Sequence, residues 1–277
     1  MNAVEKIDYL VIGHICHDLT PAGYVMGGSA AYGSSVAHAL GCRSAVLTSS
    51  ALEDSWREEL PDIALERIVA AETTVFENIY VGEARQQKLH SVAGRLGPDD
   101  VPQMWQRASI MHLAPIVNEV DADLIDLFTN SIVGVSPQGW MRRWDVDGRV
   151  YVVEWEDADR MLPLAAVTFV SEEDLVQAND IERFAAIAPL LVQTEGASGC
   201  TVFWNGERRS FPATTTPLVD PTGAGDCFAA AYLVRFLQTG GDPWESARFA
   251  NIIAGQSVSH RGIPAKLSAI RNRLVST

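Results

Sequence analysis

The chain is short of basic residues. Its 277 residues include 21 Lys and Arg against 35 Asp and Glu, which gives a formal net charge of −14. Nucleic acids and anionic membranes are bound through basic patches, so this shortage argues against either as a main partner. An anionic substrate would instead need a local pocket of hydrogen-bond donors, with Mg²⁺ to offset the repulsion.

Cysteines are also few, and they are scattered at Cys16, Cys42, Cys200 and Cys227. There is no Cys-x-x-Cys pair and no zinc-like spacing. Four such residues in a chain of this length are typical of reduced thiols and exclude a disulfide scaffold as the expected architecture.

Long apolar runs are missing as well. Even the apolar stretch Cys227–Leu237 is interrupted by Arg235, so no stretch is long enough to span a bilayer. The first residues, Met1–Lys6, lead into a strand-like run without the apolar core of a signal peptide. We therefore expect a cytoplasmic protein with no membrane partner.

Short apolar runs typical of buried parallel strands recur along the chain. They lie at Tyr9–Gly13, Ala45–Thr48, Ser109–Leu113, Ile132–Val135, Val167–Val170 and Leu190–Gln193. Helical patterns lie between them, at Gly27–Leu40, Asp121–Phe128, Glu172–Ala178 and Ile181–Ala188. This alternation predicts an α/β fold with a mostly parallel sheet covered on both faces. Because no repeat or clear linker interrupts it, we predict a single domain over residues 1–277.

Two further segments complete the expected architecture. Thr201–Trp204 and Glu207–Phe211 flank Asn205-Gly206, a strong two-residue hairpin signal. The helical patterns Asp226–Gln238 and Trp244–His260 then carry the chain to its end.

The segment Thr73–Ser91 departs from this rhythm. It is rich in β-forming residues, has polar residues at alternating places and contains a Gly82 turn. This pattern predicts two antiparallel strands that are exposed on one face. A surface hairpin without a functional role is the alternative.

The strongest chemical signal is the stretch Asp220–Asp226, in which Gly223, Ala224 and Gly225 precede an acid and a helical run. The first N–H groups of a helix lack intrahelical partners and, with the helix dipole, form a pocket for an anion. Asp226 at the mouth of this pocket could take a proton from an attacking hydroxyl, a layout suited to phosphoryl transfer to an alcohol. An ordinary tight turn with Asp226 as helix N-cap is the alternative.

The run Asp220–Phe228, Asp-Pro-Thr-Gly-Ala-Gly-Asp-Cys-Phe, resembles the C-terminal signature of the ribokinase-like or PfkB carbohydrate kinases. The resemblance implies a three-layer α/β/α fold with a small β-lid, and ATP-dependent phosphorylation of a sugar or polyol hydroxyl. It implies that Asp226 is the catalytic base, that Gly223–Gly225 form the anion hole and that Thr222 contacts the donor. The implied cofactors are ATP and Mg²⁺, with a monovalent cation as a further candidate.

The acceptor side is predicted in the N-terminal half. Asp18 follows the first strand, at the edge where ligands gather in parallel sheets, and the family has an Asp there that grips the substrate. An Asp that caps a turn is the alternative. Gly27 and Gly28 resemble the Gly-Gly turn that opens a helix beneath the acceptor. Tyr32 stands where the family commonly carries Asn, and an aromatic ring suits a substrate ring stacked face-on.

In the family a small β-lid covers the sugar, and the segments near residues 14–26 and 73–91 look like that lid. Asn78 within it is predicted to contact the acceptor. The exposed strands of such a lid could also pair edge to edge in a homodimer.

The donor side is predicted around Thr194, Gly196 and Gly199, in a loop that looks like the nucleotide-side loop of the family. Asn251 falls where the family lines the adenine. A routine strand–helix turn and a helix-surface Asn are the alternatives.

The segment Val170–Asp174 resembles the Asn-x-x-Glu motif of the family, which helps to place Mg²⁺ through water. Ser171 and Asp174 replace its two ends, so Asp174 is the predicted metal-site residue. A negatively charged first helical turn explains the same residues. Arg142 or Arg143 could face phosphate, although an arginine after a turn is usually only solvated.

Within the family, the run Gly13–Asp18 followed by Gly27–Tyr32 is similar to the inositol-kinase-like branch, which favours myo-inositol or a related cyclitol as acceptor. A nucleoside, ribose or fructose kinase is the alternative in the same class. A catalytically silent sugar- or nucleotide-binding regulator on this fold is the alternative from another class. A dinucleotide-binding oxidoreductase is disfavoured because Gly-x-Gly-x-x-Gly does not follow the first strand.

Overall fold

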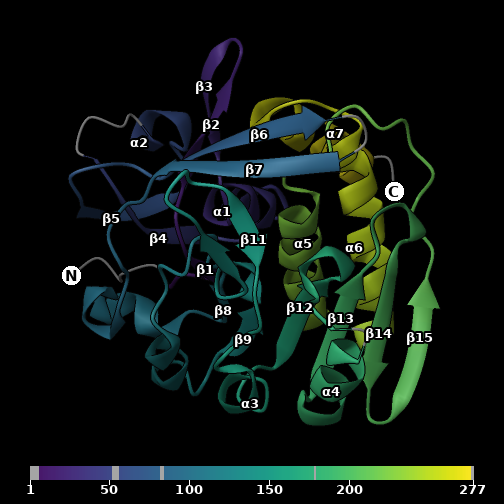
Figure 1. The fold of residues 1–277 in the computed structure, drawn as a ribbon. Coiled ribbons are helices and arrows are strands. Elements are labelled where there is room, and N and C mark those ends of the chain that lie inside the picture. Colours follow the sequence, from purple (N-terminus) through teal and green to yellow (C-terminus); the bar gives the residue numbers. More distant parts are fainter. Residues whose placement is uncertain (1–5, 52–55, 82–83, 178, 276–277) are drawn as a thin grey trace.

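A sheet of nine strands runs through the protein in the computed structural model, which describes residues 6–51, 56–81, 84–177 and 179–275 (Figure 1). The strand order is β15-β14-β13-β12-β9-β8-β1-β4-β5. The bounds are β1 Tyr9–Ile12, β4 Ser44–Ser50, β5 Ala64–Val69, β8 Ile110–Leu113, β9 Ile132–Val135, β12 Val167–Ser171, β13 Leu190–Thr194, β14 Cys200–Trp204 and β15 Glu207–Phe211.

Neighbouring strands from β5 to β13 are parallel, while β14 and β15 continue the sheet antiparallel. All six predicted buried strands and the predicted hairpin are confirmed. At the hairpin turn Asn205 and Gly206 both have positive φ, 51° and 76°, as the two-residue turn requires.

Helices cover both faces of this sheet. One face packs against α1 (Ser29–Ala39), α5 (Ala224–Gln238), α6 (Pro243–Val258) and α7 (Ile263–Val275), with Tyr9, Val11 and Phe169 in the shared core. The opposite face packs against α3 (Ala158–Met161) and α4 (Asp180–Ile187), with Leu10, Ile12 and Leu113 in a second core. The three-layer α/β/α fold is thereby confirmed.

Short elements complete the chain. The helix α2 spans Trp56–Glu59, and a ribbon of β10 (Arg142–Trp144) and β11 (Val150–Val152) lies outside the main sheet. The 3-10 helices span Pro98–Asp100, Gln103–Arg107, Ala122–Leu127, Pro137–Gly139, Glu172–Asp174 and Gly196–Ser198.

Two helix predictions were inaccurate, and one helix was not predicted. The segment predicted helical at 121–128 is a 3-10 helix capped by Asp121. The one predicted from Glu172 ends after a single 3-10 turn, because the Asp180 carboxylate accepts the Val176 and Gln177 N–H groups and holds the chain in a turn. The helix α7 was missed. Its buried residues include Lys266, and a lysine at an interior position hides the apolar periodicity.

A second sheet contains β3 (Gly23–Gly27), β2 (Cys16–Thr20), β6 (Val75–Val81) and β7 (Ala84–Ser91), in that order. We call it the small sheet. The two antiparallel strands predicted within 73–91 are confirmed as β6 and β7, while the predicted Gly82 turn lies outside the described residues. Parallel pairing of β2 with β6 joins the two predicted lid segments, and β6 and β7 cross the top of the molecule in Figure 1.

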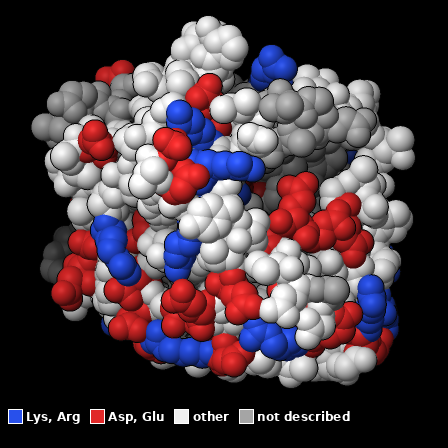
Figure 2. All heavy atoms as spheres, viewed as in Figure 1, with Lys and Arg blue, Asp and Glu red and all other residues white. Residues whose placement is uncertain are grey.

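On the face shown in Figure 2, basic side chains are interspersed with acidic ones. Within the described parts of the chain, no helix has both the length and the apolar character needed to cross a membrane.

Candidate active site

The turn before α5 is built on a left-handed glycine. Gly223 has φ 74° and is the N-cap of α5, and its carbonyl accepts the Cys227 N–H at 2.9 Å. Asp226 is the third residue of the helix, so the alternative that Asp226 is the N-cap is wrong. Its carboxylate belongs to the first helical turn, next to the N–H groups at the positive end of the helix.

Open space lies in front of this turn. A Cβ added to Gly225 would meet no heavy atom within 4 Å among the described residues other than its chain neighbours and the adjacent backbone of α5. The Ala224 N–H donates to the Pro221 carbonyl at 3.1 Å, so this donor is shared with the turn itself. The start of α5 can therefore admit an anion from the Gly225 side.

The helix α1 packs on this turn through Tyr32. A Cβ on Gly223 would lie 2.5 Å from Cγ of the Tyr32 ring, so one face of the ring rests on the glycine. Tyr32 is only 5% exposed. The face covered by Gly223 is therefore closed to a stacked substrate ring.

Asp18, in β2, lies against the start of α1. A Cβ on Gly27 would be 2.3 Å from Asp18 Oδ2, and one on Gly28 would be 2.4 Å from the His14 carbonyl oxygen. Gly28 also has φ 91°, a conformation that favours glycine. The two glycines thus make room for the carboxylate and for the chain that leads to it.

Charged groups from both halves of the chain surround Cys16, whose thiol is buried. Burial raises its pKa well above the ordinary value, and the negative charges of Asp18, Glu119 and Asp226 raise it further while Arg142 lowers it. The same pattern recurs at Tyr32, where burial and then Asp18, Cys227, Asp220 and Asp226 raise the pKa of the phenol. Packing agrees with this: Asp18 lies against Gly27 at the start of α1, and Tyr32 in the first turn of that helix rests on Gly223, three residues before Asp226. The predicted acceptor residue Asp18 and the predicted base Asp226 therefore lie in one region.

Asn78, in β6, is on the same face of the small sheet as Asp18. Asp18 is paired in register with Phe76, and side chains two residues apart on a strand point to one face. Asn78 Oδ1 accepts a hydrogen bond from Gln87 Nε2 at 3.0 Å. Phe76 packs with Cys16, Ile116 and Val117, so this face is the one turned toward the body of the protein.

Glu119 lies beside the loops that follow β1 and β8, and the sequence did not reveal its role there. It is 2% exposed, and its carboxylate accepts the N–H groups of His14, Ile116 and Val117 at 2.7–3.0 Å. It thereby fixes the loop after β8 beside the loop after β1. An isolated Glu in a loop carries no motif, so no signal in the sequence could have found it.

Asp174 is buried at 7% exposure beside Gln138, whose Nε2 donates to Asp174 Oδ1 at 3.4 Å. Burial raises the pKa of its carboxyl above the ordinary value, against the opposing charge of Arg142. Arg142 donates to the Ile116 carbonyl at 3.5 Å, whereas Arg143 pairs with Glu156 at 3.4 Å.

Within the described residues, no group of three or more His, Cys, Asp or Glu side chains could hold a metal ion. Mg²⁺ commonly keeps several waters and uses one or two carboxylates together with substrate phosphates. A single carboxylate such as Asp174 fits that mode of binding.

On the predicted donor side, Thr194 ends β13 and a tight turn leads through Gly196 and Gly199, at φ 52° and 105°, into β14. A Cβ on Gly199 would lie 2.1 Å from the Phe211 carbonyl oxygen. That oxygen also accepts Asn251 Nδ2 at 3.1 Å. Asn251 is 6% exposed, so the alternative of a helix-surface Asn is wrong, and its amide holds the hairpin to α6.

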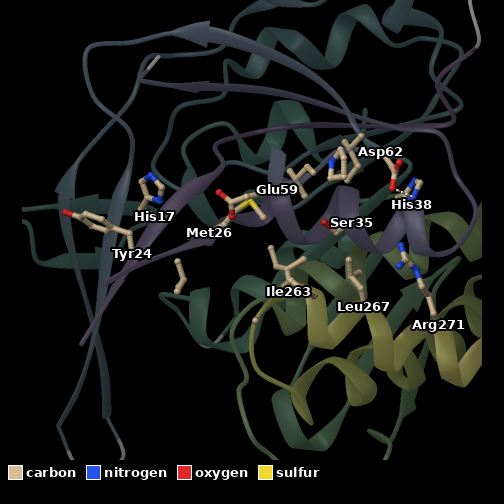
Figure 3. A pocket seen from close by; sticks show the side chains of 16 residues that line it. His17, Tyr24, Met26, Ser35, His38, Glu59, Asp62, Ile263, Leu267 and Arg271 are labelled. Carbon is tan, nitrogen blue, oxygen red and sulfur yellow. Dashed lines mark ion pairs between the residues drawn. The ribbon is translucent and has the colours of Figure 1, made fainter. Parts of the chain in front are cut away.

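A cavity of about 630 Å³ lies behind the small sheet (Figure 3). Alternation along β2 puts His17 on the side opposite Asp18, and His17 lines this cavity with Met26, Ser35, His38, Leu267 and Arg271. His38 Nε2 lies 3.9 Å from Asp62 Oδ2 at its edge. None of the individual predicted site residues lines this cavity, although His17, Tyr24, Val25 and Met26 of the predicted lid segment 14–26 do.

Comparison with known proteins agrees with this geometry. Residues 146–269 match the model of the pfkB family carbohydrate kinases, and this segment includes Asp226 and the Thr194–Gly199 turn. Inositol 3-kinase of Arabidopsis thaliana is 27% identical over 92% of this chain and 75% of its own length. Cytidine kinase of Thermococcus kodakarensis is 27% identical over 83% of this chain and 88% of its own length.

Solved structures share the fold. A pyrophosphate-dependent kinase of the ribokinase family, complexed with a pyrophosphate analog and myo-inositol, superposes with a TM-score of 0.80 at 22% identity, covering 95% of this chain and 98% of that one. Ribokinase from Thermotoga maritima superposes with a TM-score of 0.72 at 17% identity, covering 97% and 99% of the two chains.

The fold and the matches define the class, a ribokinase-like phosphotransferase with an alcohol group as acceptor. More narrowly, residues 146–269 match the pfkB family carbohydrate kinases, and most of the chain is similar to the inositol 3-kinases at 27% identity.

Proposed function

We propose that the protein uses ATP and Mg²⁺ to phosphorylate a hydroxyl of myo-inositol or a related cyclitol. The observation that carries this proposal is a packing relationship. Asp18 lies against Gly27 before α1, and Tyr32 of α1 rests on Gly223, which precedes Asp226 and the exposed start of α5 at Gly225. Similarity to the inositol 3-kinases over most of the chain supports the choice of acceptor.

Each residue has a distinct part in this reaction. Asp18 accepts hydrogen bonds from acceptor hydroxyls and so orients the ring. Asp226 takes the proton of the attacking hydroxyl as its oxygen bonds to the γ-phosphorus. The bond from the γ-phosphorus to the bridging oxygen breaks, and ADP leaves with that oxygen.

The start of α5 supplies the anion hole. The N–H groups at Gly223, Ala224 and Gly225, with the helix dipole, stabilise the charge on the transferred phosphoryl group. Mg²⁺, when bound, neutralises phosphate charge, and Asp174 would hold it through water. Arg142 would add a positive charge on the same side.

On the donor side, Thr222 and the turn of Thr194, Gly196 and Gly199 would contact the nucleotide. Asn251 would contribute through the carbonyl of its amide, because its Nδ2 is engaged by Phe211.

The small sheet would act as the lid of a single kinase domain. Asp18 and Asn78 lie on its inner face, so closing it would shield the acceptor from water. Its edge strand β3 exposes Tyr24 and Val25, at 62% and 48%, and pairing along this edge would give a homodimer in the cytoplasm.

The decisive experiment measures phosphorylated product with myo-inositol, other cyclitols, ribose, fructose, cytidine and adenosine, each with ATP and with pyrophosphate as donor. We expect the highest kcat/KM with a cyclitol and ATP. A higher kcat/KM with a nucleoside or another sugar would show that the acceptor is not a cyclitol. A higher kcat/KM with pyrophosphate would show that the donor is not ATP. Ligand binding without turnover in any combination would instead support a silent regulator.

A further inference from the structure

Lys266 is a buried cation that the proposed reaction does not yet use. The chain has only three lysines, and this one is 1% exposed on α7. Burying an ammonium is costly unless oxygens compensate for the lost water. We therefore expect a buried lysine to contact oxygen atoms that offset the loss of hydration.

Its partners all belong to the turn that precedes the anion hole. Lys266 Nζ donates to the carbonyl oxygens of Asp220 at 2.7 Å and Thr222 at 2.8 Å. It also lies 3.5 Å from Asp220 Oδ2. These two residues come directly before Gly223, so the ammonium holds the chain that leads into α5.

The turn is cross-linked around this ammonium. Asp220 Oδ1 accepts the Thr222 N–H at 3.0 Å, and the Asp220 N–H donates to the Val258 carbonyl at 3.0 Å. The Lys266 ammonium also lies 5.9 Å from the centre of the Tyr32 ring, which packs on Gly223. A single cation thus links α7, the turn and the acceptor helix α1.

We propose that Lys266 is a positioning residue for phosphoryl transfer, whose tethered ammonium serves as a built-in monovalent cation and makes the enzyme independent of added K⁺ or NH₄⁺. The role in catalysis rests on the proposed kinase function, whereas the cation role rests on the contacts alone.

The oxygen set explains why a cation is needed there. Two main-chain carbonyls and a carboxylate converge on one point, and carbonyl oxygens of this kind replace the hydration shell of a monovalent cation such as K⁺. Without a positive charge these oxygens repel one another and the turn relaxes. A displacement of about 1 Å at a reacting centre can cost on the order of 10²-fold in rate.

The test compares the wild-type protein with Lys266→Met, at constant ionic strength, in choline chloride and in KCl, NH₄Cl and LiCl. We expect the wild-type kcat to change less than about twofold among these salts. Lys266→Met should lose on the order of 10²-fold in kcat in choline. NH₄⁺ or K⁺ should recover part of it, and choline should recover none. Arg271→Met, which removes an exposed cation from the same helix, should behave as the wild type.

Thermal unfolding in the same salts gives a readout independent of turnover. K⁺ or NH₄⁺ should raise the melting temperature of Lys266→Met more than choline does, and should leave that of the wild type unchanged relative to choline. If the wild type phosphorylates no acceptor, the proposed kinase function is wrong. The melting temperatures still test whether the Lys266 ammonium acts as a monovalent cation.

Three results would overturn the inference: strong stimulation of the wild type by K⁺, wild-type kcat of Lys266→Met in choline, or a folded Lys266→Met protein that no cation affects. If Lys266→Met does not fold in choline, recovery of folding in NH₄⁺ or K⁺ supports the inference. If neither cation recovers the folding of Lys266→Met or of Lys266→Gln, the inference is contradicted.

Discussion

The Tyr32 ring rests on the α-carbon of Gly223, where an added Cβ would lie 2.5 Å from the ring. This contact joins α1, from the N-terminal third of the chain, to the turn that starts α5. The proposed acceptor side and the proposed phosphoryl-transfer side are therefore not independent, because a shift of one helix moves the other.

The two glycines of the turn should respond differently to a methyl group. In Gly225→Ala the Cβ enters open space, so we expect stability to change by less than about 1 kcal/mol. The same methyl would lie at the proposed anion site and hold the phosphoryl group away from the N–H donors, so kcat should fall roughly 10²- to 10³-fold, as when one oxyanion donor is lost. Steady-state kinetics and thermal unfolding measure the two effects separately.

Gly223→Ala is the matched comparison. Its φ of 74° and the Tyr32 contact should destabilise the fold by roughly 2–4 kcal/mol, from a left-handed alanine and local overpacking. Near-normal activity in Gly225→Ala would rule out an anion site at this position.

Replacing the proposed base should affect chemistry and not binding. Asp226→Asn keeps the size of the side chain but cannot take the hydroxyl proton, so kcat should fall roughly 10²- to 10⁴-fold. Acceptor affinity, measured by calorimetry, should change far less. Turnover close to that of the wild type would remove Asp226 from the role of base.

Asp18 and Gly27 should share a phenotype. Gly27→Ala places a Cβ 2.3 Å from Asp18 Oδ2 and so displaces the carboxylate, while Asp18→Asn removes its charge. Each should raise the acceptor KM roughly 10- to 100-fold, which corresponds to loss of one or two charge-assisted hydrogen bonds. Gly97→Ala serves as the control, because its added Cβ would approach Asp100 Oδ2 no closer than 3.8 Å. An unchanged acceptor KM in Gly27→Ala would contradict the placement of Asp18 in the acceptor site.

His112 should make the fold sensitive to acid. It is fully buried between Tyr9, at 2.7 Å, and Ser136, at 2.8 Å, and burial lowers its pKa to about 3. The imidazole is neutral in the folded protein and takes up a proton near pH 6.5 when unfolded. Its contribution to stability is present above that pH and is lost as the pH falls toward 3, by on the order of 4 kcal/mol.

Denaturant unfolding between pH 3 and 8 measures this effect. His112→Gln should have a flatter profile below pH 6.5 than the wild type. Parallel profiles of His112→Gln and the wild type would show that His112 does not titrate in this way.

The sequence revealed the sheet because its strands are buried on both faces and appear as short apolar runs. It did not reveal α7, whose interior face contains Lys266. Nor did it reveal Glu119, because three N–H groups from two loops meet at its carboxylate only in the folded chain.

The signature Asp220–Phe228 predicted the kind of chemistry through its resemblance to the PfkB carbohydrate kinases, because that signature is a continuous run of residues that the sequence itself displays. The tertiary structure decided which residues from other parts of the chain lie beside that signature. Packing put Asp18 near Asp226, rested Tyr32 on Gly223 and brought the Lys266 ammonium to the carbonyls of Asp220 and Thr222. Contacts between residues so far apart in the chain depend on how the elements pack, and no local pattern encodes them.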